Sequence, residues 1–160
     1  MRLYFDGELT YKAYYDPDTS VIDVISNAFE EEGRSDAFGG GLNICVDDED
    51  NICSLSLDLA ADTGEVPVAD RPEVAPEAYV ADVEVVREAT PRYRFDPSAG
   101  TLRVAFGDLD SLLWARLKRN LIWLGIDDDS RLASMVVEGI SRDPGGKAQA
   151  AWLQEMAGRG

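Results

Sequence analysis

The fold is decided by the stretch LNICVDDEDNICSLSL, residues 42–57, and by its counterpart IWLGIDDDSRLASMVV, residues 122–137. Each stretch contains an apolar alternation, an acidic turn and a second apolar run, which is the pattern of a β-hairpin. The counterpart lies 80 positions further along the chain, and no gap is needed to align the two. The sequence therefore predicts one small β unit present twice.

The repeat extends upstream of these hairpins. Tyr15-Asp16-Pro17 recurs as Phe95-Asp96-Pro97 at the same spacing, and each triplet precedes a short aliphatic segment. Asp before Pro is typical of a turn, because Pro presets φ and Asp bonds the backbone beyond it. We expect an α+β, mostly antiparallel β fold made of two tandem β-meander units. The units would pack about a pseudo-twofold axis as a monomer that imitates a homodimer; a true homodimer is the alternative.

The composition divides the chain into four segments. Prolines and acidic residues gather between the two copies, which is typical of an extended linker. The predicted boundaries are 1–60 for copy one, 61–78 for the linker, 79–140 for copy two and 141–160 for a C-terminal helix and tail.

Three local patterns predict further elements. Asp6-Gly7 between two apolar triplets indicates a two-residue hairpin turn. The connections at 27–41 and 108–120 are expected to hold one helix per copy, the second with leucines along one face. A last helix is expected over 144–156, with Asp143 as its N-cap and a proline in its first turn.

Side-chain parity makes predictions for three residues near the hairpins. Alternate residues of a strand point to opposite faces of the sheet. Cys53 alternates in step with the apolar residues that follow it and should point into the core, whereas Cys45 falls between apolar residues and should point outward. Opposed directions do not satisfy disulfide geometry, so reduced thiols are expected. Trp123 has outward parity and should cover a helix or a partner surface.

The charge is one-sided. The net charge is −16; residues 1–80 hold 4 Lys or Arg and 19 Asp or Glu, a balance of −15, which leaves −1 for residues 81–160. A negative field repels nucleic acid and attracts basic partners, although acidity also serves solubility or salt adaptation. The acidic residues that we expect to contact a basic protein are Glu30, Glu31, Glu32, Asp36, Asp47, Asp48, Glu49 and Asp50.

Catalytic motifs are scarce. The chain contains no histidine, which excludes triads that use one. Asp16 and Asp96 are the weak catalytic candidates, because a twofold axis would bring them together as a carboxylate pair with separated pKa values. The acidic turns lack the spacing of a calcium loop, so no metal or other cofactor is expected. The basic cluster 116–119 suits a solvated helix end or a contact with the acidic connection of copy one better than a nucleic-acid contact.

Parts of both copies resemble the short bacterial domain of unknown function 2283. The resemblance rests on Tyr15-Asp16-Pro17, on the strand at 21–24 and on the acidic turn and strand at 48–57, so that 11–60 and 91–140 each look like one such domain. The resemblance implies a β-rich fold with no established activity. Members often look like partners of toxin-like neighbours, which favours binding over catalysis.

We therefore expect a small acidic protein-binding module, immunity- or antitoxin-like, that neutralises a basic partner. One alternative is a small-molecule-binding domain or hydrolase with its site between the copies, near Asp16 and Asp96. Another is a structural module. No apolar run approaches the roughly 20 residues of a membrane span and the start lacks a signal peptide, so a cytoplasmic location without membrane contact is the expectation.

Overall fold

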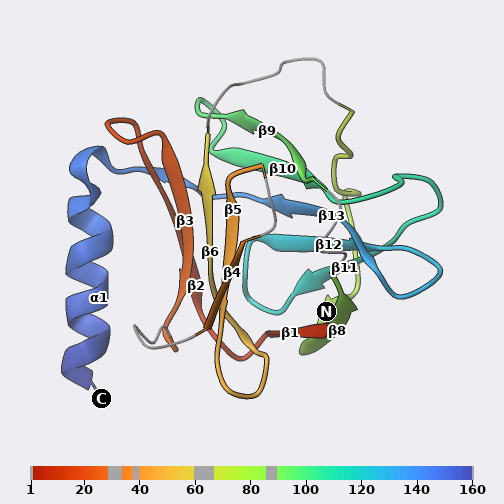
Figure 1. Cartoon of the computed structure of the whole chain (residues 1–160), viewed down its shortest axis with the longest axis horizontal. Coiled ribbons are helices and arrows are strands. Elements are labelled where there is room, and N and C mark those ends of the chain that lie inside the picture. Colours follow the sequence, from red (N-terminus) through yellow and green to blue (C-terminus); the bar gives the residue numbers. More distant parts are fainter. Residues whose placement is uncertain (1, 29–33, 38–39, 60–66, 86–89, 160) are drawn as a thin grey trace.

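The computed structural model describes residues 2–28, 34–37, 40–59, 67–85 and 90–159. About half of these residues form β-strands, and the one α-helix among them lies near the C-terminus (Figure 1). The α+β, mostly antiparallel class predicted from the sequence is therefore correct. Two six-stranded sheets make up the body of the molecule.

The two sheets are built largely from different halves of the chain. In spatial order, the first sheet consists of β14 (Ser141–Arg142), β2 (Tyr11–Asp16), β3 (Val21–Ser26), β6 (Ile52–Asp58), β5 (Leu42–Val46) and β4 (Arg34–Ala37). The second sheet consists of β7 (Glu77–Ala78), β11 (Leu113–Leu117), β12 (Ile122–Ile126), β13 (Leu132–Val137), β10 (Thr101–Ala105) and β9 (Arg92–Asp96). A two-stranded ribbon joins β1 (Arg2–Asp6) to β8 (Val80–Glu84).

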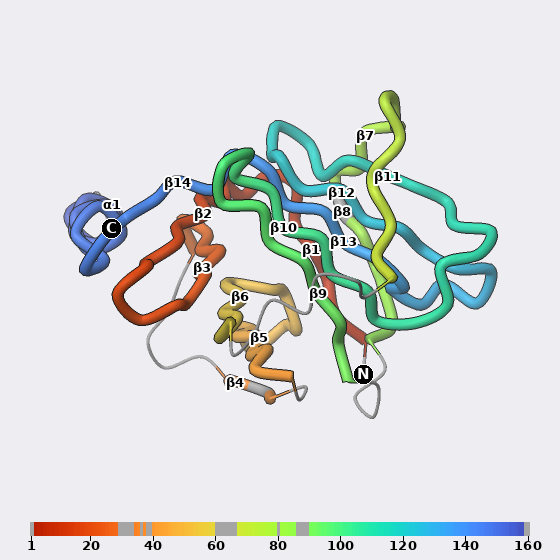
Figure 2. Tube along the Cα trace, turned by 90° about the horizontal axis from the view of Figure 1, so that it is seen from above, coloured from red at the N-terminus to blue at the C-terminus, as the bar shows by residue number. Residues whose placement is uncertain are grey.

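One apolar core lies between the sheets and the ribbon. Alternate residues of each strand point inward, as the pleat requires, and the two sheets lie across each other (Figures 1 and 2). The core joins Leu3 and Val83 of the ribbon to Ile44 and Leu55 of the first sheet and Leu124 of the second, all at most 4% exposed. Both halves bury apolar faces in this core, and a second, smaller cluster of Tyr14, Ile25 and Trp152 lies under α1.

The pairing register corresponds between the two sheets at a separation of 80. Ile44 lies opposite Leu55 in the first sheet, as Leu124 lies opposite Met135 in the second. The ribbon shows the same relation, since Leu3 pairs with Val83, the residue 80 positions later. The amide of Tyr4 donates to the carbonyl of Asp50 at 3.0 Å, and the amide of Glu84 donates to that of Ser130 at 3.1 Å.

The hairpin predicted at Asp6-Gly7 is wrong. β1 pairs with β8, and β2 pairs with β3 and β14. Gly7 is required for another reason: a Cβ there would lie 2.7 Å from the carbonyl oxygens of both Ala78 and Tyr79. The glycine thus permits close approach of a distant segment, whereas the sequence pattern indicated a local turn.

The connecting helix predicted at 108–120 is wrong, whereas the short helix predicted within 27–41, around residues 29–32, lies outside the described residues. The described parts of these connections contain the strands β4 and β11, which pair with β5 and β12. Ser111 adopts a left-handed φ of 56°, which interrupts a right-handed helix. A strand is favoured in both places because β5 and β12 would otherwise leave backbone groups unpaired.

A β-bulge falls at Cys53, near the start of β6. The register shifts between Cys45 and Val46, so that Val46 faces Ile52 while Cys45 faces Ser54. Cys53 is 1% exposed, in keeping with its predicted inward direction, whereas Cys45 is only partly buried, and both thiols are free.

The C-terminal helix is confirmed, with a later start than predicted. A short 3-10 turn, η1 (Pro144–Gly146), leads into α1 (Lys147–Arg159). The Asp143 carboxylate accepts hydrogen bonds from the amides of Ala148 and Gln149 at 2.9 and 3.0 Å. α1 lies against β2 and β3, on the side of the first sheet that faces away from the second (Figures 1 and 2).

The described part of the predicted linker forms a strap, residues 67–78, over the outer face of the second sheet. Arg71 donates to Glu138 at 2.7 and 3.2 Å, and its guanidinium lies 4.1 Å from the centroid of the Trp123 ring. Asp70 forms an ion pair with Arg103 at 3.2 Å. Trp123 does point out of the core, as its parity indicated, and the strap covers it.

Candidate functional site

A pocket of about 220 Å³ opens where the two sheets meet at the β2–β3 and β9–β10 turns. We call it the seam pocket. Both sheets contribute to its walls, which are aromatic and aliphatic apart from hydroxyl groups. The lining residues are Tyr15, Ser20 and Leu59 from the first half and Tyr93, Phe95 and Pro97 from the second.

Tyr15 and Phe95 hold the two sides of the seam pocket together. They occupy equivalent positions, 80 residues apart, at the ends of β2 and β9. Their ring centroids lie 4.8 Å apart with the planes at 62°, an edge-to-face contact. Both rings are only partly buried, with one side packed on the core. The other side is therefore available to the pocket.

Ser20 is a strained residue in this pocket. Its φ is 57°, in the left-handed region that favours glycine, and the equivalent residue in the second half is Gly100, with φ of 64°. The first half therefore keeps a serine where the backbone prefers glycine, at a cost of order 1 kcal/mol. Ser20 shares this backbone region with four other described non-glycine residues, Asp50, Ser111, Arg119 and Ser130.

Asp16 and Asp96 follow Tyr15 and Phe95 in the chain, but neither lines the seam pocket. Asp16 lines a different pocket next to α1, and each carboxylate is bonded to a turn. Asp16 accepts hydrogen bonds from the amides of Gly145 and Asp18 at 3.0 and 2.9 Å, and those bonds lower its pKa, Gly145 most strongly. Asp96 accepts from the hydroxyl of Ser98 at 2.6 Å, which is the main reason that its pKa is lowered too. A carboxylate pair that shares a proton would instead raise one of the two pKa values. The geometry therefore gives these residues structural roles.

The acidic turn between β5 and β6 is also partly structural. The Asp47 carboxylate accepts from the amides of Glu49 and Asn51 at 2.8 and 2.9 Å. Burial alone would raise the pKa of Asp47, but the bonds from Asn51 and Glu49 outweigh it and lower that pKa. Asp50 forms an ion pair with Arg34 at 2.9 Å. Of this turn, Asp48 and Glu49 are exposed to solvent.

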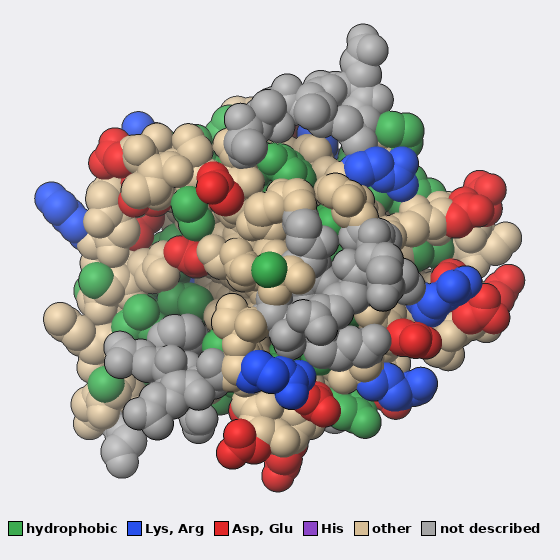
Figure 3. Space-filling view, viewed as in Figure 1, with side chains coloured by type: hydrophobic (Ala, Val, Ile, Leu, Met, Phe, Trp, Pro, Cys, Tyr) green, Lys and Arg blue, Asp and Glu red, His purple; other side chains and the backbone are tan. Residues whose placement is uncertain are grey.

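The structure says less about the other four acidic residues that were predicted to contact a basic protein. Glu30, Glu31 and Glu32 lie outside the described residues, and Asp36 lies in β4. On the face shown in Figure 3, acidic side chains are scattered around the periphery and alternate with basic ones. The acidity of the chain therefore acts as a broad field there, without one compact patch.

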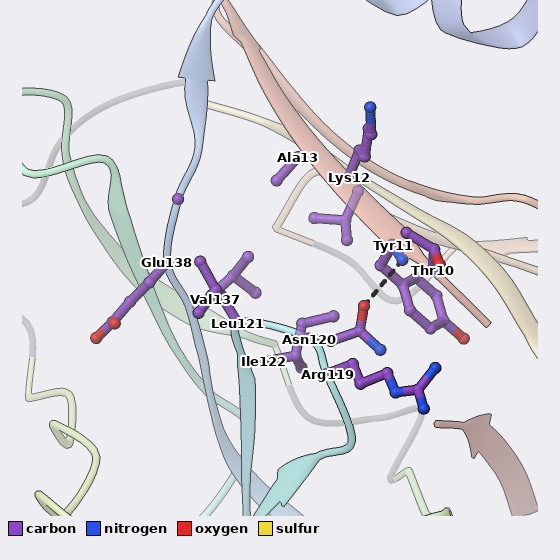
Figure 4. A pocket seen from close by; sticks show the side chains of 12 residues that line it. Thr10, Tyr11, Lys12, Ala13, Arg119, Asn120, Leu121, Ile122, Val137 and Glu138 are labelled. Atoms are coloured by element: carbon purple, nitrogen blue, oxygen red, sulfur yellow. Dashed lines mark hydrogen bonds between the residues drawn. The ribbon is translucent and has the colours of Figure 1, made fainter. Parts of the chain in front are cut away.

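A second pocket, of about 200 Å³, lies between β2 and the β11–β12 turn (Figure 4). Its central residue, Asn120, is 4% exposed. The Asn120 side chain accepts from the amide of Tyr11 at 3.0 Å and donates to the carbonyls of Leu9 and Lys118 at 3.0 and 2.9 Å. The side chain of Lys12 extends upward and that of Arg119 to the right, both away from Asn120 (Figure 4). Asn120 thus joins the two halves, a role that the sequence did not indicate.

The basic cluster predicted at a helix end lies in β11 and the turn that follows. Arg116 lies over the Trp123 ring, 5.4 Å from its centroid. Lys118 forms an ion pair with Glu8 at 3.0 Å and lies 4.0 Å from the centroid of the Tyr79 ring. These cations serve internal contacts, which accounts for their clustering without a nucleic-acid ligand.

Within the described ranges, no group of three or more His, Cys, Asp or Glu residues is arranged to hold a metal ion. The helical part of the same ranges contains no segment long and apolar enough to cross a membrane. No protein-family model, curated protein or solved structure matches this chain. The seam pocket is therefore interpreted from its own chemistry.

Proposed function

We propose that this protein is a non-catalytic binding module that recognises a basic protein partner, with the seam pocket as its anchor. The observation that carries the proposal is an aromatic pocket at the junction of the two halves, flanked by turns whose carboxylates stay ionised. Interface hot spots are typically a side chain of one partner inserted into such a pocket. The strained Ser20 in its wall supports a role beyond packing.

The size of the seam pocket favours a side chain over a larger ligand. Pockets for drug-sized molecules measure about 300–1,000 Å³, whereas this one measures about 220 Å³. A volume of that order accommodates the end of one side chain. The remaining affinity would then come from the surface around the pocket.

The charge distribution supports a basic partner. Residues 1–80 have a balance of −15, from 19 acidic and 4 basic residues. Such a field accelerates association with a cationic protein and repels nucleic acids. The exposed Asp48 and Glu49 contribute to it without an evident structural use. An immunity- or antitoxin-like role is consistent with this mode of binding and with the family resemblance noted above.

The proposal is tested by capture at low ionic strength followed by kinetics. The full chain is immobilised, the captured protein is identified, and its association rate is measured over a salt series. We expect a basic protein whose association rate falls steeply as salt increases. Tyr93→Leu should increase the dissociation rate, and Tyr79→Leu, a ring outside the pocket, should not. A rate that does not depend on salt, or the absence of any retained protein, refutes the proposal.

A small molecule is the second candidate ligand, because the seam pocket is concave and draws its walls from both halves. A thermal-shift series with small aromatic compounds addresses it. A concentration-dependent rise in melting temperature that Tyr93→Leu abolishes would favour this candidate.

We also propose that the two halves arose by duplication and pack about a pseudo-twofold axis that passes near Leu3 and Val83. Matching strand order, matching register and the self-equivalent pairing of the ribbon support this proposal. The seam pocket would then lie between two related units that have diverged at Ser20 and Gly100. Divergence at a shared position is expected where one copy acquires a binding role.

A further inference from the structure

The outer faces of the two sheets differ in what covers them. On the second sheet, Trp123 and Val136 lie opposite each other under the strap and are only 5% and 0% exposed. On the first sheet, the residues 80 positions earlier are Asn43 and Ser56, which are exposed and half-buried. α1 lies over β2 and β3 (Figures 1 and 2). The outer face is therefore open to solvent over β5 and β6.

The strap shows how an extended segment holds to such a face. Asp70 forms an ion pair with Arg103 of β10 at 3.2 Å. The next residue, Arg71, forms one with Glu138, directly after β13, at 2.7 Å. Further along, the strap becomes β7 and pairs with β11 in the parallel direction. Two ion pairs on the face are thus combined with main-chain pairing at the edge.

The outer edge of the first sheet offers the same main-chain groups. Ala37 in β4 lies opposite Asn43 in β5, and Arg116 in β11 lies opposite Trp123 in β12. The Arg116 amide points away from β12 and donates to the carbonyl of Pro76 in the strap at 2.8 Å. By the same alternation the amide of Ala37 points away from β5. β4 is the last strand of its sheet among the described residues, so this edge can accept an extended segment.

The charges on the first sheet require a basic segment. Asp23 takes the place of Arg103, so it would repel a residue like Asp70 and attract a Lys or Arg there. Asp58 takes the place of Glu138, so the basic residue that follows in the strap is kept. Neither Asp23 nor Asp58 forms an ion pair with a described residue. The strap itself has one Arg and three acidic residues, so the strap of a second copy does not fit.

We propose that the outer face of the first sheet binds an extended basic segment of a partner protein, which adds to β4 as a parallel strand. Two consecutive Lys or Arg residues of the segment face Asp23 and Asp58, and its main chain meets the open edge at Ala37. Main-chain bonds of this kind supply affinity, and the side-chain pairs supply specificity. That a basic protein carries the segment rests on the proposed function, whereas the shape and charge of the surface do not.

The probe is a peptide with the sequence of the strap, residues 67–78, in which Asp70→Arg, Glu73→Lys and Glu77→Lys replace the acidic residues. The controls are the unchanged strap peptide and a scrambled peptide of the same basic composition. In NMR titrations of the full chain, we expect the basic peptide to shift amides of β4, β5 and β6. It should bind at least about tenfold more tightly than either control. Binding no tighter than the controls, or shifts confined to other elements, overturns the proposal.

Variants locate the peptide on this face. Asp58→Lys should weaken binding of the basic peptide at least about tenfold. Asp110→Lys makes the same change of charge at an exposed site of the second half, and it should weaken binding about twofold or less, because solvent and salt screen distant charges.

Ala37→Pro removes the amide at the open edge and leaves the bonds between β4 and β5 intact, because Pro is tolerated where its missing N–H faces solvent. It should weaken binding about tenfold. If Asp58→Lys and Ala37→Pro both bind as the parent does, with amide spectra of a folded chain, this face is not the site. A loss in Asp58→Lys alone overturns the strand addition.

The captured partner separates this proposal from the proposed function. A basic protein whose affinity falls in Tyr93→Leu but not in Asp58→Lys supports the proposed function and overturns the surface proposed here. Binding of the basic peptide to β4, β5 and β6 without any captured protein leaves this surface standing and refutes the proposed function.

Discussion

Replacement of Asn120 by alanine is predicted to weaken the junction between the two halves. The side chain satisfies the amide of Tyr11 and the carbonyl of Leu9, which are more than 100 residues away in the chain, and it is 4% exposed. The substitution leaves those two buried backbone groups without their partner, at about 1–2 kcal/mol each, so we expect a loss of about 2–4 kcal/mol in the free energy of unfolding. The backbone bonds of residue 120 itself remain.

The assay is urea unfolding followed by tryptophan fluorescence, together with a thermal scan. For a domain of this size the loss corresponds to a decrease in melting temperature of roughly 4–16 °C. Asn27→Ala is the matched control, because the exposed Asn27 amide also accepts one backbone bond, from Thr10 at 3.1 Å. That control should lose less than about 1 kcal/mol. Equal small losses in the two variants would refute the reasoning that Asn120 joins the halves.

Three further predictions concern backbone strain, the C-terminal helix and pH. Ser20→Gly should raise the free energy of unfolding by about 0.5–1 kcal/mol, because it relieves the left-handed φ of 57°. Gly100→Ser should lower the free energy of unfolding, since a Cβ there would lie 2.8 Å from the carbonyl oxygen of Ile140. Chemical denaturation measures both variants, and a gain in stability for Gly100→Ser contradicts the argument. Trp152→Ala removes a side chain that is 6% exposed and lies between α1 and the first sheet. If α1 unfolds together with the body, the free energy of unfolding should fall by about 3–5 kcal/mol. A separate melting transition for α1 in far-ultraviolet circular dichroism would show that the helix unfolds independently. Folding lowers the pKa of four carboxyl groups, those of Asp16, Asp47, Asp96 and Asp127. Their contribution to stability is therefore complete above the unfolded pKa of about 3.9 and is lost as the pH falls through the folded pKa values. A melting temperature that stays constant from pH 5 down to pH 2 contradicts this prediction.

The elements that the sequence predicted correctly are those whose pattern is local. The hairpins at 42–57 and 122–137 occur as β5–β6 and β12–β13, because alternation on either side of an acidic turn is sufficient to define a hairpin. The C-terminal helix is equally local, with Asp143 as its cap. In each case the information lies within about 16 residues of sequence.

The errors have two causes. Gly7 is a glycine because residues 78 and 79 approach it, and nothing next to it in the chain indicates that. The leucines of 108–120 fit a helix by spacing, but β12 needs a neighbour and β11, one turn away in the chain, supplies it. Tertiary pairing decides such segments against their local preference.

The candidate site was only partly visible in the sequence. A position between the copies near Asp16 and Asp96 was one of the alternatives that the repeat indicated, and the seam pocket lies beside those residues. The rings that line it were missed, because Tyr93 on an edge strand looks like an ordinary core residue. The available signal was the alignment of Ser20 in the first half with Gly100 in the second. A serine aligned with a turn glycine indicates a backbone conformation kept under strain.

The contrast in charge between the two halves is a matter of composition, and the strap engages part of the basic complement of the second half. Arg103 and Arg116 on the outer face of the second sheet are engaged by Asp70 and by Trp123, so the near-neutral half uses its cations in internal contacts. The positions 80 residues earlier are Asp23 and Asp36, where no equivalent of the strap exists among the described residues. The second half still exposes basic residues such as Arg131 and Arg142, whereas the first half presents the carboxylates of Asp48 and Glu49 to solvent. The negative field is therefore set mainly by the first half, and these two carboxylates lie at the end of β6 opposite to the β2–β3 turn and the seam pocket.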